Sequence, residues 1–270
     1  MLTESPRLDR MRIIDLSHPL WEKTPYSPNA PGFRRTLLRR HGDVTLDEDV
    51  SFASDLLVTG THVGTHMDAL SHISCEMRLH GGHDAEAAQR GGTFSVHGIE
   101  DFQSFVSRAV LFDIPRIRGV ETLDAADAIT PDDLQACVER DGFDVEPGDV
   151  ALIRSGWSRH VADTEKFVGL RDGVPGINLD AAKWLSTRDV RAVGGETIAL
   201  EQIPPHVGHA RMPVHRHLIV EKGVTIIEVM RLDDLAAAGA VESIIVLAPL
   251  PLVGATGSPV RPLALIPQDA

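Results

Sequence analysis

Aromatic residues and cysteines are scarce in this sequence. Phenylalanine, tryptophan and tyrosine together make up 4% of the 270 residues, and there are two cysteines. Cys75 and Cys137 form no CxxC pair, so we expect two ordinary reduced thiols and neither a disulfide nor a closed thiolate zinc site. Long hydrophobic runs are lacking too, because the apolar stretch from Ile244 to Ala255 is too short to span a bilayer and is interrupted by prolines.

Positive charge is also in short supply. The chain has 26 Lys and Arg residues against 39 Asp and Glu residues, a formal net charge of −13 and a pI near 5.4. Phosphate backbones and anionic membranes are recognised by basic surfaces, so we expect neither nucleic acid nor a membrane as a partner. The segment from Met1 to Pro6 has no basic stretch followed by an apolar one, and we expect a cytoplasmic protein.

Hydrophobic residues make up 43% of the chain, which is enough to bury one substantial core. No repeat, low-complexity run or long linker divides the sequence. We therefore expect residues 1–270 to form a single domain.

Short apolar, β-branched segments alternate with helical patterns along the chain. Thr130, followed by Pro131 and an acidic first turn, begins a helix that Gly142 ends. The alternation predicts an α/β layered fold, although the strand spacing is too irregular for an eight-fold barrel and no Gly-x-Gly-x-x-Gly indicates a Rossmann domain. Strands are expected at 12–16, 55–59, 109–114, 150–154, 192–194, 224–229 and 243–247, and further helices at 179–187, 213–222 and 233–238.

Three histidines and one aspartate lie within the eleven residues from His62 to His72, which read His-Val-Gly-Thr-His-Met-Asp-Ala-Leu-Ser-His. His62 and His66 alone could be ligands on successive turns of a helix, but Asp68 would then point away from His66. In an extended segment, positions 62, 64, 66 and 68 share one face. Gly64 would leave room there for backbone or substrate to approach an ion.

Imidazole and carboxylate groups together suit zinc, manganese or iron better than calcium. Surface histidines are common, and this chain has thirteen, so a lone histidine would not indicate a metal site. Four metal-competent groups on one short segment instead predict a site for a divalent metal, zinc or manganese, with His62, His66 and Asp68 as ligands. The sequence is compatible with one ion or two per chain.

The pattern His-x-Gly-Thr-His-x-Asp-x-x-x-His resembles the signature of the putative cyclase family, which includes bacterial kynurenine formamidases and isatin hydrolases. Residues 13–20, 148–154 and 254–262 resemble the opening, central and closing segments of that family. The resemblance therefore runs nearly end to end. It implies a compact α/β domain of the swivelling β/β/α type with a mixed sheet, and association into a homo-oligomer, a dimer or a tetramer.

A second group of histidines, His206, His209, His215 and His217, lies downstream and precedes Glu228. The resemblance implies that a histidine at the start of a helix and Glu228 complete a second metal site. His215 and His217 both stand near that helix start, and we prefer His215 because its place fits the family's form of the helix better. His206 and His209 lie in a Pro- and Gly-rich loop and are expected to line the entrance.

A bound divalent ion lowers the pKa of water toward neutrality, so the site predicts attack of water on a carbonyl group. His72, expected just past a turn, is the predicted catalytic acid and base. The resemblance implies hydrolysis of a cyclic or aryl amide, a formamide or lactam similar to N-formylkynurenine or isatin. Leu70 departs from the formamidase branch, many members of which have proline at that position.

Trp21 and Phe52 stand out among the few aromatic residues as predicted walls for a flat ring substrate. The resemblance implies that the stretch around Trp21 can reach a neighbouring subunit's pocket. Glu196 and Glu201 suit either a pocket or the surface.

Two other functions fit the same residues. One is a metal-dependent cyclase or dehydratase of secondary metabolism, which consumes no water, and the other is a non-catalytic protein that binds metal or a small molecule. A proton-transfer histidine disfavours the non-catalytic function, because binding alone does not need one.

Overall fold

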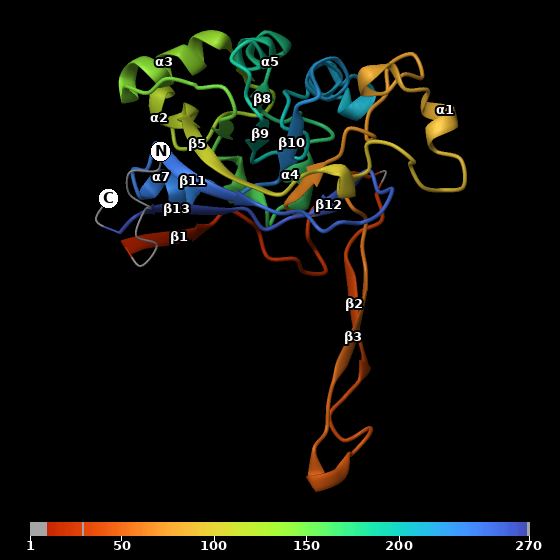
Figure 1. Ribbon diagram of the computed structural model, residues 1–270. Coiled ribbons are helices and arrows are strands. Elements are labelled where there is room, and N and C mark those ends of the chain that lie inside the picture. Colours follow the sequence, from red (N-terminus) through yellow and green to blue (C-terminus); the bar gives the residue numbers. More distant parts are fainter. Residues whose placement is uncertain (1–9, 29, 269–270) are drawn as a thin grey trace, which may run out of the picture.

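The computed structural model describes residues 10–28 and 30–268 (Figure 1). Nine of the described strands form one mixed sheet in the order β1-β13-β11-β5-β7-β9-β10-β4-β12. The central strands β5, β7, β9 and β10 run parallel, and antiparallel pairs flank them on both sides. In sheet order, the bounds are β1 (Met11–Asp15), β13 (Leu263–Pro267), β11 (Glu242–Leu247), β5 (Phe105–Asp113), β7 (Val150–Arg154), β9 (Ala192–Gly195), β10 (Thr225–Glu228), β4 (His66–Asp68) and β12 (Gly257–Pro259).

The middle of the sheet is buried on both faces, as parallel strands covered on both sides require. Successive side chains of β5 therefore enter two different apolar cores. Leu111 packs with Leu152 in one core, and Phe112 packs with Ile153 in the other. The core around Phe112 lies under the helices α2, α3 and α5, which cover the upper face of the sheet in Figure 1.

The helix α3 (Pro131–Asp141) begins and ends where the sequence predicts. The hydroxyl of Thr130 accepts from the backbone N–H of Asp133, and the Asp133 carboxylate accepts from the backbone N–H of Thr130, which makes a capping box. Gly142 ends the helix with a φ of 70°. The helices expected at 179–187 and 233–238 are confirmed as α5 (Leu179–Ser186) and α7 (Asp233–Ala237).

The helix expected at 213–222 is present, but it changes type along its length. A single α-turn, α6 (Pro213–His215), continues into the π-helical segment η7 (Arg216–Lys222), and Gly223 ends it with a φ of 68°. π-Helical turns are rare and frequently occur at functional sites.

The remaining elements are short. They are the helices α1 (Ala85–Ala88), α2 (Ile114–Arg118) and α4 (Thr164–Val168), the 3-10 turns η2 (Asp47–Asp49), η3 (His80–Gly82), η4 (Ile99–Asp101), η5 (Trp157–His160) and η6 (Gly208–Ala210), and the paired strands β6 (Ala128–Ile129) and β8 (Gly176–Ile177). Within the described residues, no helix combines the length and apolar character needed to cross a membrane.

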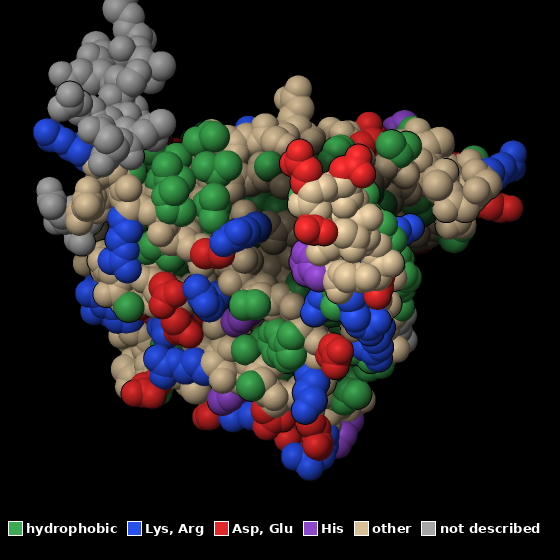
Figure 2. All heavy atoms as spheres, turned by 90° about the horizontal axis from the view of Figure 1, so that it is seen from below, with side chains coloured by type: hydrophobic (Ala, Val, Ile, Leu, Met, Phe, Trp, Pro, Cys, Tyr) green, Lys and Arg blue, Asp and Glu red, His purple; other side chains and the backbone are tan. Residues whose placement is uncertain are grey.

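A hairpin of two strands, β2 (Arg34–Arg39) and β3 (Ser54–Val58), projects far from the body of the molecule (Figure 1). We call residues 33–59 the arm. Several of its large apolar side chains are exposed, including Leu38, Leu57 and Val58. Figure 2 views the molecule from the arm side and shows hydrophobic side chains interspersed with charged ones around a hollow.

The predicted α/β class with a mixed sheet is confirmed, and every expected strand overlaps an observed one. The expected extended run through positions 62–68 is wrong at its start. Gly64 has a φ of 66°, so the strand β4 covers only His66–Asp68 and His62 lies in the preceding loop. The positive φ favours glycine at this position, and a Cβ there would also displace the Leu20 side chain, whose methyl carbon would lie 2.3 Å away.

Candidate metal centre

Two paired strands supply the centre of a polar cluster inside the protein. His66 and Asp68 lie two residues apart on β4 and share one face of the sheet, while Met67 between them faces the apolar core. Glu228, at the end of β10, is the direct antiparallel partner of His66. This register brings Nε2 of His66 to 3.2 Å from Oε2 of Glu228.

Loops on either side of β4 add His62 and His72. Nδ1 of His62 lies 2.8 Å from Oδ1 of Asp68, and its Nε2 lies 2.9 Å from the hydroxyl of Thr256. A turn closed by the hydrogen bond from the backbone N–H of His72 to the carbonyl of Ala69 brings His72 back to the cluster. There its ring stacks on that of His62, with 4.0 Å between the centroids.

The helix α6 supplies His215. Its Nε2 lies 3.1 Å from Oε1 of Glu228 and 3.6 Å from Oδ2 of Asp68. Asp68 consequently takes part in two groups of side chains that can each place their ligand atoms within 4.8 Å of one another. These groups are His62, Asp68 and His72, and Asp68, His215 and Glu228.

The cluster is buried and rich in negative charge. Asp68 is 0% exposed, yet its pKa lies far below the usual value because His72, His62 and His66 outweigh the opposing effect of burial. Burial by itself lowers the pKa of His215, but hydrogen bonds to Glu201 and Glu228 raise it to about 10. The carboxylates that face His215 therefore favour its protonated form in the absence of a metal.

Two atoms of the cluster are buried without a hydrogen-bond partner among the described residues. They are Nε2 of His66, whose approach to Glu228 is poorly aligned for a hydrogen bond, and Oδ2 of Asp68. A buried lone pair without a donor is costly unless a cation fills the space in front of it. Imidazole nitrogens and carboxylate oxygens are suitable ligands for a divalent metal, so these residues fit such an ion.

A cavity of about 290 Å³ opens onto the cluster. Ile73, Ile198 and Met212 give it apolar walls, and Ser27 and His209 line it as well, with 3.3 Å between the hydroxyl of Ser27 and Nδ1 of His209. His209 is thus at the position expected for an entrance residue. The neighbouring His206 is exposed and does not line this cavity.

The structure separates the two histidines between which the sequence left a choice. His215 lies in the cluster, as described above. His217 points the other way, with Nε2 2.9 Å from the hydroxyl of Ser186 and Nδ1 2.9 Å from Glu221.

The two aromatic residues expected to hold substrate lie apart from the cluster within one chain. Trp21 is half-buried in the N-terminal loop, where its backbone N–H donates to the hydroxyl of Thr24. Phe52 lies on the arm with the guanidinium of Arg39 5.5 Å from its ring centre. Neither residue lines the cavity at the histidines.

The sequence did not show whether Glu201 lies in a pocket or on the surface. The structure places it directly behind His215. It is 1% exposed, and its Oε1 lies 2.5 Å from Nδ1 of His215. Glu196 is also buried, but it accepts backbone hydrogen bonds from Ser155, Gly156 and Leu232 and joins the ends of strands. Burial and the nearby Asp233 raise the pKa of Glu196 to about 7.

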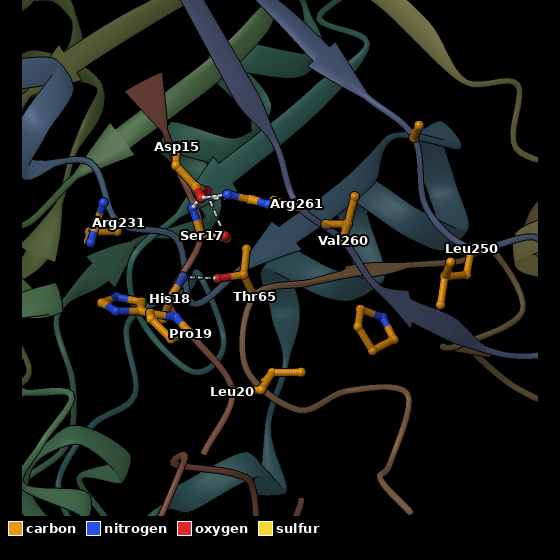
Figure 3. A pocket seen from close by; sticks show the side chains of 12 residues that line it. Asp15, Ser17, His18, Pro19, Leu20, Thr65, Arg231, Leu250, Val260 and Arg261 are labelled. Carbon is orange, nitrogen blue, oxygen red and sulfur yellow. Dashed lines mark hydrogen bonds and ion pairs between the residues drawn. The ribbon is translucent and has the colours of Figure 1, made fainter. Parts of the chain in front are cut away.

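A larger hollow, of about 590 Å³, lies beside the N-terminal segment that follows β1 (Figure 3). The hydroxyl of Thr65 accepts from the backbone N–H of His18 and donates to the carbonyl of Val229. These bonds tie the N-terminal segment to β4 and β10 next to the cluster. The clustered histidines themselves do not line this hollow.

The chain is similar to known proteins over most of its length. The sequence model described as Putative cyclase matches residues 14–202. An isatin hydrolase from Roseibium aggregatum is 25% identical over 264 residues, which cover 96% of this chain and 93% of that protein.

Solved structures give the same result at the level of the fold. A crystal structure described as a novel cyclase superposes with a TM-score of 0.85 and 28% identity, covering 94% of this chain and 88% of the other. Isatin hydrolase A from Ralstonia solanacearum has a TM-score of 0.74 and 25% identity, covering 96% and 93%. A predicted metal-dependent hydrolase from Bacillus stearothermophilus has a TM-score of 0.62 and 27% identity, covering 94% and 98%. Because the family match covers well over half of the 270 residues, the chain belongs to the Putative cyclase family.

Proposed function

We propose that this protein is a metal-dependent hydrolase that cleaves a cyclic or aryl amide, a lactam or a formamide, with water. The buried cluster of Asp68, Glu228 and the surrounding imidazoles carries the proposal, because its ligand atoms converge and a cation would satisfy the two buried atoms that lack partners, Nε2 of His66 and Oδ2 of Asp68. The likeness to an isatin hydrolase and to a predicted metal-dependent hydrolase supports hydrolysis as the reaction class.

Charge balance favours two divalent ions over one, with zinc or manganese as the metal. The carboxylates of Asp68, Glu201 and Glu228 are buried together, and in the described part of the chain their ion-pair partners are histidines, with no lysine or arginine among them. With neutral imidazoles, one divalent cation leaves a net negative charge. Two cations leave a net positive charge, which suits a substrate carbonyl that becomes negative during attack.

A divalent metal in this position would supply Lewis acidity and make water more acidic. We assign the proton transfers to His72, which lies at the edge of the cluster. Burial lowers the pKa of His72 to about 4, although Asp68 opposes the shift, so its imidazole is neutral near pH 7. A neutral imidazole there can take a proton from water and give it to the departing nitrogen.

The size and lining of the cavity indicate a small substrate. Its volume of about 290 Å³ is at the lower end of the range of about 300–1,000 Å³ for small-molecule sites. Apolar walls from Ile73, Ile198 and Met212 suit a flat ring, with the reacting carbonyl directed toward the histidines.

We further propose that the protein acts as a homo-oligomer in which the arm packs on a second copy. An isolated two-stranded hairpin is at best marginally stable in water, and the exposed Leu38, Leu57 and Val58 gain from being covered. Phe52 on the arm could then approach substrate only in another subunit, whereas Trp21 would act from the N-terminal loop. The unpaired Cys75 and Cys137 suit a reducing cytoplasm.

Cyclase or dehydratase chemistry is the second candidate, because the structure described as a novel cyclase superposes with a TM-score of 0.85. The two reactions differ in the fate of water. Incubation with isatin or an aryl formamide in ¹⁸O-labelled water, followed by mass spectrometry, tests the proposal. Hydrolysis predicts ring opening or deformylation with one labelled oxygen in the carboxylate product; turnover of carbonyl substrates without incorporated oxygen would contradict it.

A further inference from the structure

Glu201 stands behind the metal-competent groups, on the far side of the His215 ring. We propose that Glu201 is a positioning residue that holds His215 with Nε2 directed at the metal and thereby sets the affinity of the Asp68, His215 and Glu228 group for its ion. The inference rests on the proposed metal site and assigns a role to a residue outside the ligand set.

The Glu201 carboxylate accepts three hydrogen bonds at the start of α6. Oε1 accepts from Nδ1 of His215 at 2.5 Å and from its backbone N–H at 3.1 Å, and Oε2 accepts from the backbone N–H of Val214 at 3.2 Å. One carboxylate thus fixes both the backbone and the ring of the same histidine. Charge-assisted hydrogen bonds of this kind are roughly twice as strong as neutral ones.

The contact with Nδ1 determines which ring nitrogen can bind metal. An anionic carboxylate can only accept, so Nδ1 of His215 must carry a proton. In a neutral imidazole, Nε2 then keeps its lone pair, and this atom faces Glu228 at 3.1 Å and Asp68 at 3.6 Å. Carboxylates that hold metal-binding histidines in this way commonly raise the metal affinity.

Glu201 itself is poorly placed to be a ligand. The imidazole of His215 lies between its carboxylate and the other ligand atoms, and the metal-competent groups among the described residues do not include it. Its effect on a bound ion would therefore pass through His215.

The backbone around Glu201 is held firmly enough for this task. Glu201 forms a parallel bridge with Ile177, and the backbone N–H of Gln202 donates to the carbonyl of Ile177. Gly176 makes the close approach possible, because a Cβ there would lie 2.3 Å from the carbonyl oxygen of Leu200. The carboxylate is thus anchored to β8 and not only to the loop that carries it.

A matched pair of variants separates positioning from simple helix capping. Glu201→Gln keeps the shape and an acceptor oxygen but removes the charge, and Glu201→Ala removes the contact. Glu221→Gln is the control, because Glu221 accepts from Nδ1 of His217 at 2.9 Å in the next turn without touching the cluster. Circular dichroism would verify that each variant is folded.

The measurement is zinc affinity and stoichiometry by competition with a chromophoric chelator. We expect Glu201→Gln and Glu201→Ala to weaken one bound zinc by about 10- to 100-fold, and Glu221→Gln to match the wild type. ¹H–¹⁵N NMR of the zinc-loaded proteins should show a strongly hydrogen-bonded Nδ1–H signal for His215 in the wild type, and this signal should shift in Glu201→Ala.

Wild-type zinc affinity in both folded Glu201 variants, with an unchanged His215 Nδ1–H signal, would overturn the inference and leave the proposed hydrolase intact. Conversely, a wild-type protein that binds zinc but cleaves no amide would defeat the proposed function, while weakened zinc binding in the Glu201 variants would still support this role. A wild type that binds no zinc would overturn both.

Discussion

His66 and Glu228 face each other across the antiparallel pairing of β4 and β10, with 3.2 Å between Nε2 and Oε2. The sheet itself therefore positions these two groups, and the rest of the cluster assembles around them. This arrangement explains why residues 162 positions apart in the sequence can form one centre. It also indicates which substitutions should disturb the metal and which should disturb only the fold.

Glu228→Gln should remove the charge from one metal-competent group and leave the predicted ligands His62, His66 and Asp68 in place. We expect amide hydrolysis to fall by about 100-fold or more and the bound metal to fall by one equivalent per chain. Metal analysis beside initial rates would check this. Unchanged activity with a full metal complement would show that Glu228 is not a ligand.

His18 should make the stability of the protein sensitive to acid. It is 8% exposed and lies at the hollow of Figure 3, where burial and the charge of Arg231 lower its pKa to about 4. The folded-state pKa of His18 is below the unfolded value of about 6.5. The contribution of neutral His18 to the free energy of unfolding is therefore complete above pH 6.5 and is lost as the pH falls toward 4.

The size of the His18 contribution should be up to about 3 kcal/mol, because each pKa unit corresponds to about 1.4 kcal/mol. Urea unfolding at pH 7 and at pH 5 should show a smaller loss of stability in His18→Gln than in the wild type. His41→Gln on the exposed arm is the control and should behave as the wild type does. Equal losses in all three proteins would contradict the assignment.

Charges placed on the arm should disrupt assembly without unfolding the body. Leu38→Glu and Leu57→Glu replace exposed apolar side chains of β2 and β3. We expect light scattering to give a lower molecular mass for each variant than for the wild type. The body of each dissociated variant should remain folded, which a cooperative thermal unfolding transition would show. Val253→Glu, at a position that is 79% exposed on another part of the surface, is the matched control. A wild type that is already monomeric would refute the role of the arm.

Gly176→Ala should destabilise the protein through backbone crowding. The added methyl group would meet the Leu200 carbonyl and the Glu201 backbone at under 2.5 Å, and neither atom belongs to a flexible side-chain end. Overpacking of this kind costs about 1–3 kcal/mol. Chemical denaturation would measure it, and a free energy of unfolding equal to that of the wild type would show that the segment can move aside.

The sequence was most informative where the chemistry is local. His62, His66, Asp68 and His72 lie within eleven residues, and their types alone indicate metal binding. Strand positions were equally accessible because buried parallel strands such as β7 are short, continuous apolar runs.

Contacts between residues that lie far apart in the chain could not be predicted from the sequence. Glu201 meets His215 only because β8 and α6 bring their loops together, and no spacing rule describes that contact. The arm could not be foreseen either, since β3 has an ordinary strand pattern and nothing in its residues shows that it leaves the body. The φ of Gly64 removed His62 from the strand that the alternating pattern predicted.

Counting the metal ions in the purified wild-type protein tests the central claim most directly. After exposure to zinc or manganese and removal of excess metal, elemental analysis beside Asp68→Asn would give the equivalents per chain. We predict two equivalents in the wild type and fewer than one in Asp68→Asn, because Asp68 belongs to both metal-competent groups. A wild type that retains no divalent metal, or an Asp68→Asn protein that retains as much as the wild type, would contradict the account.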